Sequence, residues 1–260
     1  MSEGLEISDT GGVRTITLNR PDTRNALTVE LVGAIGDAVR DVPASVRVIV
    51  VTGAGGAFCS GLDLKDAMRR GLRAGPQVEA DLRTHFHGTI KALVACDRPT
   101  IAAVDGAAAG FGCDLALACD VRWLSDRAIF GEIFVKRGLM PDGGGTWLLP
   151  RIVGLGRALE IMYTGDRIAA DEALRIGLAN RVVPAAELGA RVGEFADRLA
   201  AGPPLVYRSI KRAVYASADG ELAAALDREA KGQIELLSSR DFAEGIAAFL
   251  GKREPRFEGR

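Results

Sequence analysis

Residues 99–115, PTIAAVDGAAAGFGCDL, run from a short apolar strand through a glycine-rich turn into the start of a helix. Residues 46–64, VRVIVVTGAGGAFCSGLDL, follow the same order: strand, Gly-Ala loop, helix start. The spacings differ, so the two segments are not a strict repeat. They nevertheless predict two similar strand–turn–helix units lying side by side.

The rest of the chain predicts an α/β fold followed by helices. Residues 13–18 alternate apolar and polar side chains, as a half-buried strand does. Residues 46–51 are mostly β-branched, which is typical of a strand buried on both faces. We expect helices over residues 26–42 and 78–95, and from about residue 154 onward a series of helices only. The predicted domains are an α/β core (1–200) and a C-terminal helical oligomerisation region (201–260).

Composition excludes several classes of protein. The 260 residues include 33 Lys and Arg against 34 Asp and Glu, a net charge of −1, so nucleic acid is not the expected partner. No apolar run of about 18 residues predicts a membrane span, and the N-terminus lacks a signal-peptide pattern. Four irregularly spaced cysteines form no CxxC pair (Cys59, Cys96, Cys113 and Cys119). We therefore expect a cytoplasmic protein with free thiols.

Common catalytic motifs are missing from the sequence. It contains no Walker phosphate loop and no G-x-S-x-G nucleophile elbow. The only histidines are His85 and His87, and no metal-ligand spacing occurs, so no metal is expected. Carboxylates, backbone groups and one histidine remain as candidate catalytic groups.

The two glycine-rich turns suggest a use for backbone groups. N–H groups at the start of a helix have no partner within the helix, and the helix dipole adds positive character there. The amides of Leu62 and Phe111 can therefore be aimed at one oxygen as an oxyanion hole. The alternative is that these glycines serve only tight turns and close packing.

Several motifs, in order along nearly the whole chain, resemble the enoyl-CoA hydratase/isomerase (crotonase) family: NRP with NAL at 19–27, AFCSGLDLK at 57–65, residues 99–115, FG at 130–131, GLMPDGGGT at 138–146 and FLGKREP at 249–255. This resemblance implies a spiral of ββα units with a C-terminal helical trimerisation region. It also implies an acyl-CoA thioester substrate, a homotrimer or homohexamer, and no cofactor beyond the CoA moiety.

The resemblance assigns roles residue by residue. It places the oxyanion-hole amides on Leu62 and Phe111, where Phe111 replaces a glycine and its ring is expected to reshape the acyl pocket. Positions that resemble the CoA site are Arg24, Ala26, Ser60, Leu62, Asp63, Leu64, Lys65 and Gly110, together with Phe249 and Lys252 reaching a neighbouring subunit. For Arg24 and Lys65 the alternative is a solubilising surface charge.

The carboxylates distinguish the reactions of this family. Hydratases use two glutamates, which here correspond to Asp114 and Phe134, so the hydration apparatus looks incomplete. Glu132 lies two residues before Phe134, out of register, and we expect it to be uninvolved. Asp142 matches the catalytic aspartate of some isomerases, and residues 138–151 most resemble the phenylacetate-pathway enoyl-CoA isomerases.

An isomerase needs a base that moves a proton within the bound acyl chain, and an apolar pocket helps by raising the pKa of a carboxylate. We expect Phe111, Phe134, Met140 and Trp147 to line it. The alternatives are that Asp142 only caps a helix starting near Gly143 and that Asp114 is a structural acid.

The sequence therefore predicts an enoyl-CoA isomerase that uses Asp142, with Asp114 polarising the substrate or sharing the proton. A hydratase using Asp114 and Asp142 is the alternative. A dehalogenase-like hydrolase assisted by His87 and a non-catalytic relative are further possibilities. The acyl group, the pathway and the choice of trimer or hexamer stay open.

Overall fold

The computed structural model describes residues 3–71, 73–218 and 220–260. Its main sheet has six strands in the order β1-β2-β3-β4-β6-β9, in which β1 pairs antiparallel with β2 and the other pairs are parallel. The strands are β1 (Leu5–Thr10), β2 (Val13–Leu18), β3 (Val48–Gly53), β4 (Thr100–Val104), β6 (Val121–Ser125) and β9 (Arg181–Val183). A second, small sheet has the order β5 (Ala107–Ala109), β7 (Ile129–Gly131) and β8 (Ile168–Ala169).

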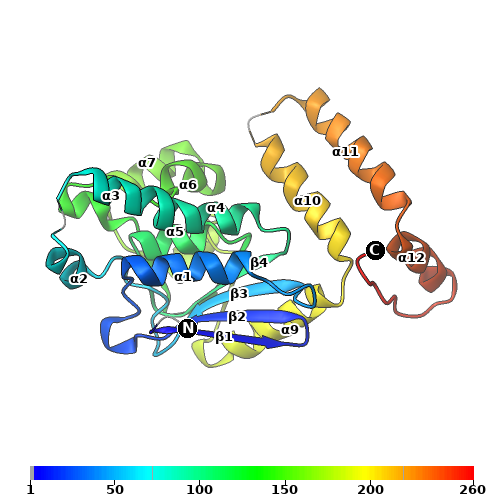
Figure 1. Cartoon of the computed structure of the whole chain (residues 1–260), viewed down its shortest axis with the longest axis horizontal. Coiled ribbons are helices and arrows are strands. Elements are labelled where there is room, and N and C mark those ends of the chain that lie inside the picture. The colour runs from blue at the N-terminus through cyan, green and yellow to red at the C-terminus, as the bar shows by residue number, and fades with distance from the viewer. Residues whose placement is uncertain (1–2, 72, 219) are drawn as a thin grey trace.

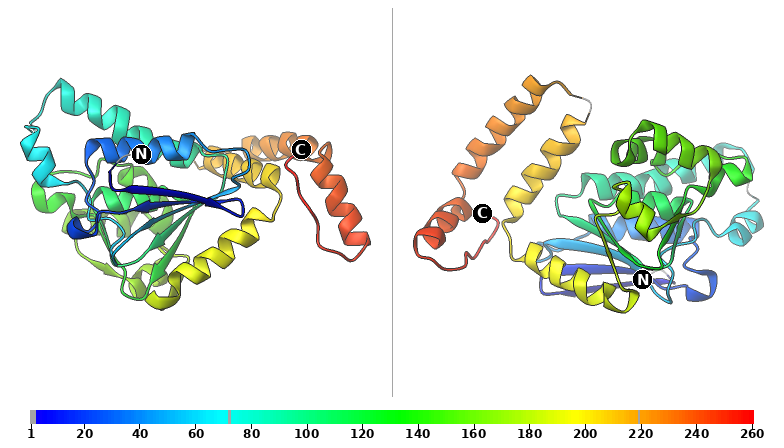
Figure 2. Two further views of the ribbon diagram at one scale, coloured as in Figure 1. Left: turned by 60° about the horizontal axis from the view of Figure 1, so that its bottom comes forward. Right: turned by 180° about the vertical axis from the view of Figure 1, so that it is seen from behind.

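Strand β3 is buried on both faces, as its β-branched sequence predicts. Ile49 and Val51 point into the larger core, whereas Val48 and Val50 point into a smaller core on the opposite face. The sheet is therefore the middle layer of three. Helix α9 (Leu188–Ala200) supplies the apolar side chains of the smaller core and lies across that face alone (Figure 2).

The other face of the sheet carries most of the helices (Figure 1). A stripe of apolar side chains on α1, which lies within the helix predicted over residues 26–42, is buried here. The helices of this part of the chain are α1 (Val29–Arg40), α2 (Leu64–Arg69), α3 (Pro76–Asp81), α4 (His87–Ala95), α5 (Phe111–Leu117), α6 (Gly145–Val153), α7 (Leu155–Thr164) and α8 (Ala170–Arg175).

Two expectations about helices need correction. The helix expected over 78–95 is α3 and α4 joined by a π-helical turn at Leu82–Phe86. The chain after residue 154 is not purely helical, because β8 and β9 extend the two sheets. Strands of two and three residues are too short to show an alternating pattern, so periodicity does not predict them.

The last helices, α10 (Pro204–Ser217), α11 (Leu222–Leu237) and α12 (Arg240–Leu250), extend away from the α/β layers (Figures 1 and 2). Helix α10 is attached by Lys211, whose buried ammonium donates to Leu93 O and to Asp120 Oδ2, both at 2.9 Å. The C-terminal tail returns to the core, where Arg47 donates to Phe257 O at 2.8 Å. The division into domains 1–200 and 201–260 stays a prediction.

The projecting helices leave large apolar side chains in water. An apolar surface of this extent on one part of a molecule marks an interaction site. The exposed residues on α10, α11 and α12 are Ile210, Val214, Leu222, Leu226, Ile234, Leu237, Phe242, Ile246, Phe249 and Leu250. We therefore expect these helices to pack against other copies of the chain.

Light scattering at micromolar concentration should give the mass of three or six chains. The double variant Leu226→Glu/Ile246→Glu places charges on this surface and should lower the mass, with the α/β circular dichroism retained. Gln233→Glu, which adds a charge at an already polar position of α11, is the matched control. A wild-type protein that runs as a monomer would contradict the expectation.

Candidate active site

The two glycine-rich turns lie side by side, as the sequence predicts. Cys59 N–H donates to Ala107 O at 2.8 Å, and Ala109 N–H donates to Cys59 O at 2.9 Å. The turns approach so closely that a Cβ at Gly61 would lie 2.7 Å from Ala109 O and 3.7 Å from the Phe111 nitrogen. Only glycine fits there, since its φ of +93° is also in the left-handed region.

The close approach brings together the amides of Leu62 and Phe111. Phe111 is the first residue of α5, where an N–H has no partner within the helix. Among the described residues, neither the Leu62 N–H nor the Phe111 N–H donates to another protein group. Two free donors at neighbouring turns are what an oxyanion hole needs. That role stays a prediction.

Asp114 lies in the first turn of α5 and is completely buried. Its Oδ2 accepts a hydrogen bond from Gly143 N–H at 3.0 Å, whereas its Oδ1 has no partner. The glycines opposite are required by this contact. A Cβ at Gly143 would lie 2.5 Å from Asp114 Oδ2, and one at Gly145 would collide with Oδ1. The glycine-rich segment 143–145 therefore wraps closely around the Asp114 carboxyl.

Glu132 belongs to this group of carboxyls, which corrects the expectation that it lies outside the site. It directly follows β7 and is 1% exposed, and neither of its carboxyl oxygens has a hydrogen-bond partner. A Cβ at Gly145 would lie 3.0 Å from Glu132 Oε1 as well as against Asp114. Phe134, the residue in register, instead places its ring beside Gly110.

Strand geometry indicates that Glu132 points into the protein, although alignment with the family hydratases selects Phe134 as the corresponding position. Residues i and i+2 of a strand point to the same side. Phe130 in β7 is fully buried, so Glu132, two residues later, continues toward the interior.

Asp142 lies close enough to these two acids for its charge to act on both, and it is partly exposed. It does not cap a helix, because α6 begins at Gly145 with Gly144 at the N-cap position and without a side-chain cap. This removes the capping alternative for Asp142. Its neighbour Gly143 is held by Asp114, so the position of Asp142 depends on the buried acid behind it.

Burial governs the charge of all three carboxyls. It raises the pKa of Asp142, and the charge of nearby His87, at the start of α4, opposes that rise. Burial raises the pKa of Glu132 to about 7; contacts with the Cys113 thiol and the Asp114 carboxyl oppose this rise, and the negative charge of Asp142 adds to it. The pKa of Asp114 is well above its usual value because of burial and the charges of Glu132 and Asp142.

The apolar surroundings of Asp142 differ in part from those expected. The Phe111 ring packs edge-on against Phe86, with centroids 4.9 Å apart, and abuts Gly143. Met140, however, is 68% exposed. Trp147 stacks on Tyr215 of α10, 6.4 Å between centroids, instead of facing the carboxyls.

Most of the expected CoA positions lie together. Ser60 N–H donates to Arg24 O at 3.0 Å. This hydrogen bond holds the residues after the short 3₁₀ helix Pro21–Thr23 against the turn before α2. Asp63 already has structural partners, since it caps α2 through Asp66 N–H and pairs with Arg20 at 3.0 Å. The side chains of Arg24, Leu64 and Lys65 are exposed.

Phe249 and Lys252 are not near that cluster within one chain. They lie in or just after α12, at the opposite end of the molecule from α2 (Figure 1). Phe249 is 81% exposed. Any contact they make with a CoA held at Arg24 and Lys65 therefore has to come from another subunit.

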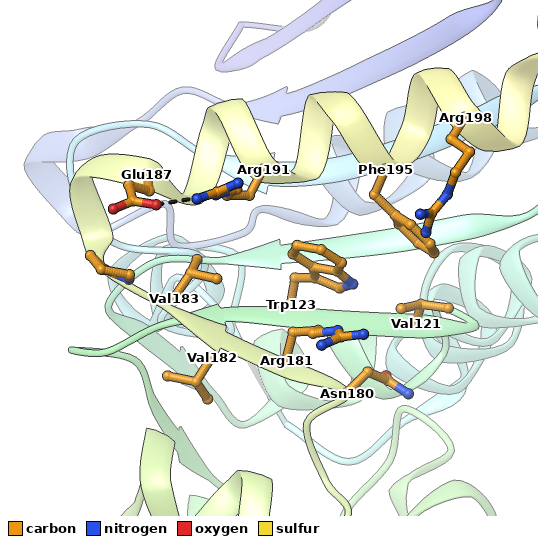
Figure 3. Close-up of a pocket in the computed structure, with 11 residues that line it drawn as sticks. Val121, Trp123, Asn180, Arg181, Val182, Val183, Glu187, Arg191, Phe195 and Arg198 are labelled. Atoms are coloured by element: carbon orange, nitrogen blue, oxygen red, sulfur yellow. Dashed lines mark hydrogen bonds and ion pairs between the residues drawn. The ribbon is translucent and has the colours of Figure 1, made fainter.

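A separate groove of about 710 Å³ lies between α9 and two strands of the sheet, β6 and the edge strand β9 (Figure 3). Trp123 and Phe195 stack inside it at 5.1 Å, and Arg181 and Arg198 lie over their rings. It holds neither the free amides nor the three carboxyls.

Two negative findings concern the described residues. No group of three or more His, Cys, Asp or Glu side chains in residues 3–71, 73–218 and 220–260 is arranged to hold a metal ion. No helix in the same ranges is long and apolar enough to span a membrane.

Comparisons with known proteins show the family of the chain. The profile of the enoyl-CoA hydratase/isomerase family matches residues 8–260, so the chain belongs to that family. A Rhodobacter capsulatus protein named "probable enoyl-CoA hydratase" is 42% identical over 98% of this chain and 97% of its own length. The 1,2-epoxyphenylacetyl-CoA isomerase of Escherichia coli is 35% identical, with 96% of each chain covered.

Among solved structures, an enoyl-CoA hydratase subunit from Geobacillus kaustophilus superposes with a TM-score of 0.91. It is 40% identical, and the match covers 99% of this chain and 98% of the other. The fold is thus the crotonase fold, and the chain is an acyl-CoA enzyme of this family.

Substituting Gly145→Ala should disturb the carboxyl group directly, because the added Cβ collides with Asp114 Oδ1. We expect a loss of about 1–3 kcal/mol in the free energy of unfolding, measured by urea denaturation, together with reduced turnover. Gly156→Ala is the matched control, since a Cβ at that position in α7 meets nothing within 4 Å. Equal stability of the two variants would show that the carboxyls move aside freely.

Proposed function

We propose that this enzyme isomerises the double bond of an enoyl-CoA, with Asp142 as the base that moves the proton. The observation that carries the proposal is the arrangement of the carboxyls. Asp142 is the only one of the three carboxyls that is partly exposed, and it does not cap a helix. Asp114 and Glu132 are fully buried. One accessible carboxylate suits a reaction that returns the proton it removes.

The proposed reaction converts a 3-enoyl thioester to its 2-enoyl isomer. The Asp142 carboxylate removes a proton from C2, and the electron pair of that C–H bond moves into a dienolate whose charge rests on the thioester oxygen. The Leu62 and Phe111 amides stabilise this oxygen. Asp142 then returns the proton to C4, so that the double bond lies between C2 and C3 and the base is regenerated.

The electrostatics support this use of Asp142. A base works best when its pKa lies near the working pH. Burial moves the pKa of Asp142 upward, in that direction. Substrate binding is proposed to use Arg24 and Lys65 for the CoA phosphates, with Phe249 and Lys252 added by a neighbouring subunit.

Hydration of a 2-enoyl-CoA is the second candidate, and the name of the Rhodobacter relative favours it. Hydration needs two groups that both reach a water molecule. Asp114 is fully buried, and Phe134 stands where the second glutamate of hydratases is expected. A hydrolase in which His87 assists Asp142 would also need Asp142 to be accessible to substrate and water, and His87 does lie near Asp142.

The variant Asp142→Asn should lower the turnover of 3-enoyl-CoA by at least about 100-fold, because it removes the base and retains the shape. Turnover is followed by the rise in absorbance of the conjugated 2-enoyl thioester. The free energy of unfolding should change little, since the variant replaces a partly exposed carboxylate and removes no helix cap.

Asp166→Asn, an exposed acid, serves as the control and should retain full turnover. The proposal is wrong if the wild-type enzyme leaves 3-enoyl-CoA unchanged while it consumes the absorbance of 2-enoyl-CoA. That outcome identifies a hydratase.

A further inference from the structure

Two of the three carboxyls in the site have no role in the proton transfer proposed above. Asp114 and Glu132 lie behind Asp142, and both are at most 1% exposed. Three of their four carboxyl oxygens, Asp114 Oδ1 and both oxygens of Glu132, have no hydrogen-bond partner. Buried polar atoms without partners are rare in proteins and need an explanation.

A shared proton explains these oxygens. Two ionised carboxylates are acceptors only, so neither can satisfy the other, and their charges repel in a dry environment. With one proton between them, one carboxyl becomes a donor and the other its acceptor. Asp114 Oδ1 and Glu132 Oε1 both border the space that a Cβ on Gly145 would occupy, so the two groups are neighbours.

We propose that Asp114 and Glu132 form a buried acid pair that holds one proton, and that Glu132 is a positioning residue for Asp142. The proposal rests on Asp142 being the base. The connection runs from Glu132 to Asp114 Oδ1, and from Asp114 Oδ2 to Gly143 N–H, which is the peptide next to Asp142. Glu132 thus acts through Asp114 and does not touch the substrate.

The pair carries one negative charge while it keeps its proton. Loss of the proton places two charges side by side and leaves Asp114 Oδ1 without a donor. The repulsion disturbs the hydrogen bond to Gly143, and the second charge makes Asp142 a poorer proton donor for the return step. The last proton stays on Asp114, because burial and the charge of Glu132 hold the pKa of that carboxyl well above its usual value, so its loss falls on the alkaline side of neutrality.

The titratable groups that face the pair come from three elements besides β7. Cys113 of α5 is buried against Glu132. Burial and the charges of Glu132 and Asp114 hold the pKa of Cys113 well above the usual value, so its thiol stays neutral and faces Glu132 as a weak donor. Asp142 adds negative charge from the segment before α6, and His87 of α4 faces Asp142 from the other side. No cation among the described residues makes an ion pair with Asp114 or Glu132.

The first test needs no substrate, so it separates this inference from the proposed reaction. An acid whose pKa is higher in the folded protein than the ordinary 4.5 stabilises the fold below that value, and this stability is lost as pH rises toward about 7. The Tm of the wild type should therefore fall between pH 5 and pH 8 more than that of Glu132→Gln. Over this pH range, the Tm of the wild type should decrease by about 5 °C more than the Tm of Glu132→Gln.

The second test is the pH profile of kcat. Gln at position 132 can still donate to Asp114 Oδ1 but cannot lose a proton, so Glu132→Gln should abolish the alkaline decline of the wild type. Glu132→Leu has no donor and should lower kcat about 10-fold, with little change in KM. If Glu132→Gln retains most of the kcat that Glu132→Leu loses, the role of Glu132 is a positioning hydrogen bond and not packing alone.

Glu160→Gln, an exposed acid on α7, is the control for both tests and should match the wild type. The inference is overturned if Glu132→Gln shows the same dependence of Tm on pH as the wild type and Glu160→Gln. If the Tm result holds and the wild type does not convert 3-enoyl-CoA, the acid pair exists and the proposed reaction is what fails. An isomerase rate that Glu132→Leu leaves unchanged shows instead that Glu132 does not position Asp142.

Discussion

The site depends on three neighbouring carboxyl groups, those of Asp114, Glu132 and Asp142, whose surroundings contain too little water to solvate three negative charges. Asp114 and Glu132 are fully buried, and the charge of the partly exposed Asp142 acts on both. Ionising all of them together is unfavourable because burial removes hydration and their charges repel. The number of protons in the group, more than any single residue, therefore governs its chemistry. The glycines of segment 143–145 allow this crowding, since side chains there would occupy the space of the carboxyl oxygens.

The same constraint connects the fold to the proposed reaction. The parallel sheet places the two glycine-rich turns together, so that two amides without partners lie at one place. Helix α5 then runs from the Phe111 amide to the Asp114 carboxyl within one turn. One short helix thus carries both the amide proposed to stabilise the enolate oxygen and the buried acid that holds Gly143, the neighbour of the proposed base Asp142. Buried acids reduce stability, as expected where function requires strain.

Much of this was predictable from the sequence, and the exceptions have physical reasons. The β-branched run at residues 46–51 and the two glycine-rich turns predict the sheet and the neighbouring amides, because burial and backbone freedom are local properties. Strands β8 and β9 were missed because they are too short for periodicity. Glu132 was missed because register with the family points to Phe134, whereas the direction of β7 decides which side chain enters the site.

The central claim is that a proton is shared behind Asp142, and NMR of the carboxyl carbons tests it most directly. Enzyme labelled with carbon-13 at its Asp and Glu side-chain carboxyls is titrated, and the Glu132→Gln spectrum is subtracted to isolate Glu132. The account predicts that the Glu132 carboxyl keeps its proton up to about pH 7, well after exposed carboxyls have ionised. A Glu132 signal that titrates with the exposed carboxyls, near pH ~4, would contradict it.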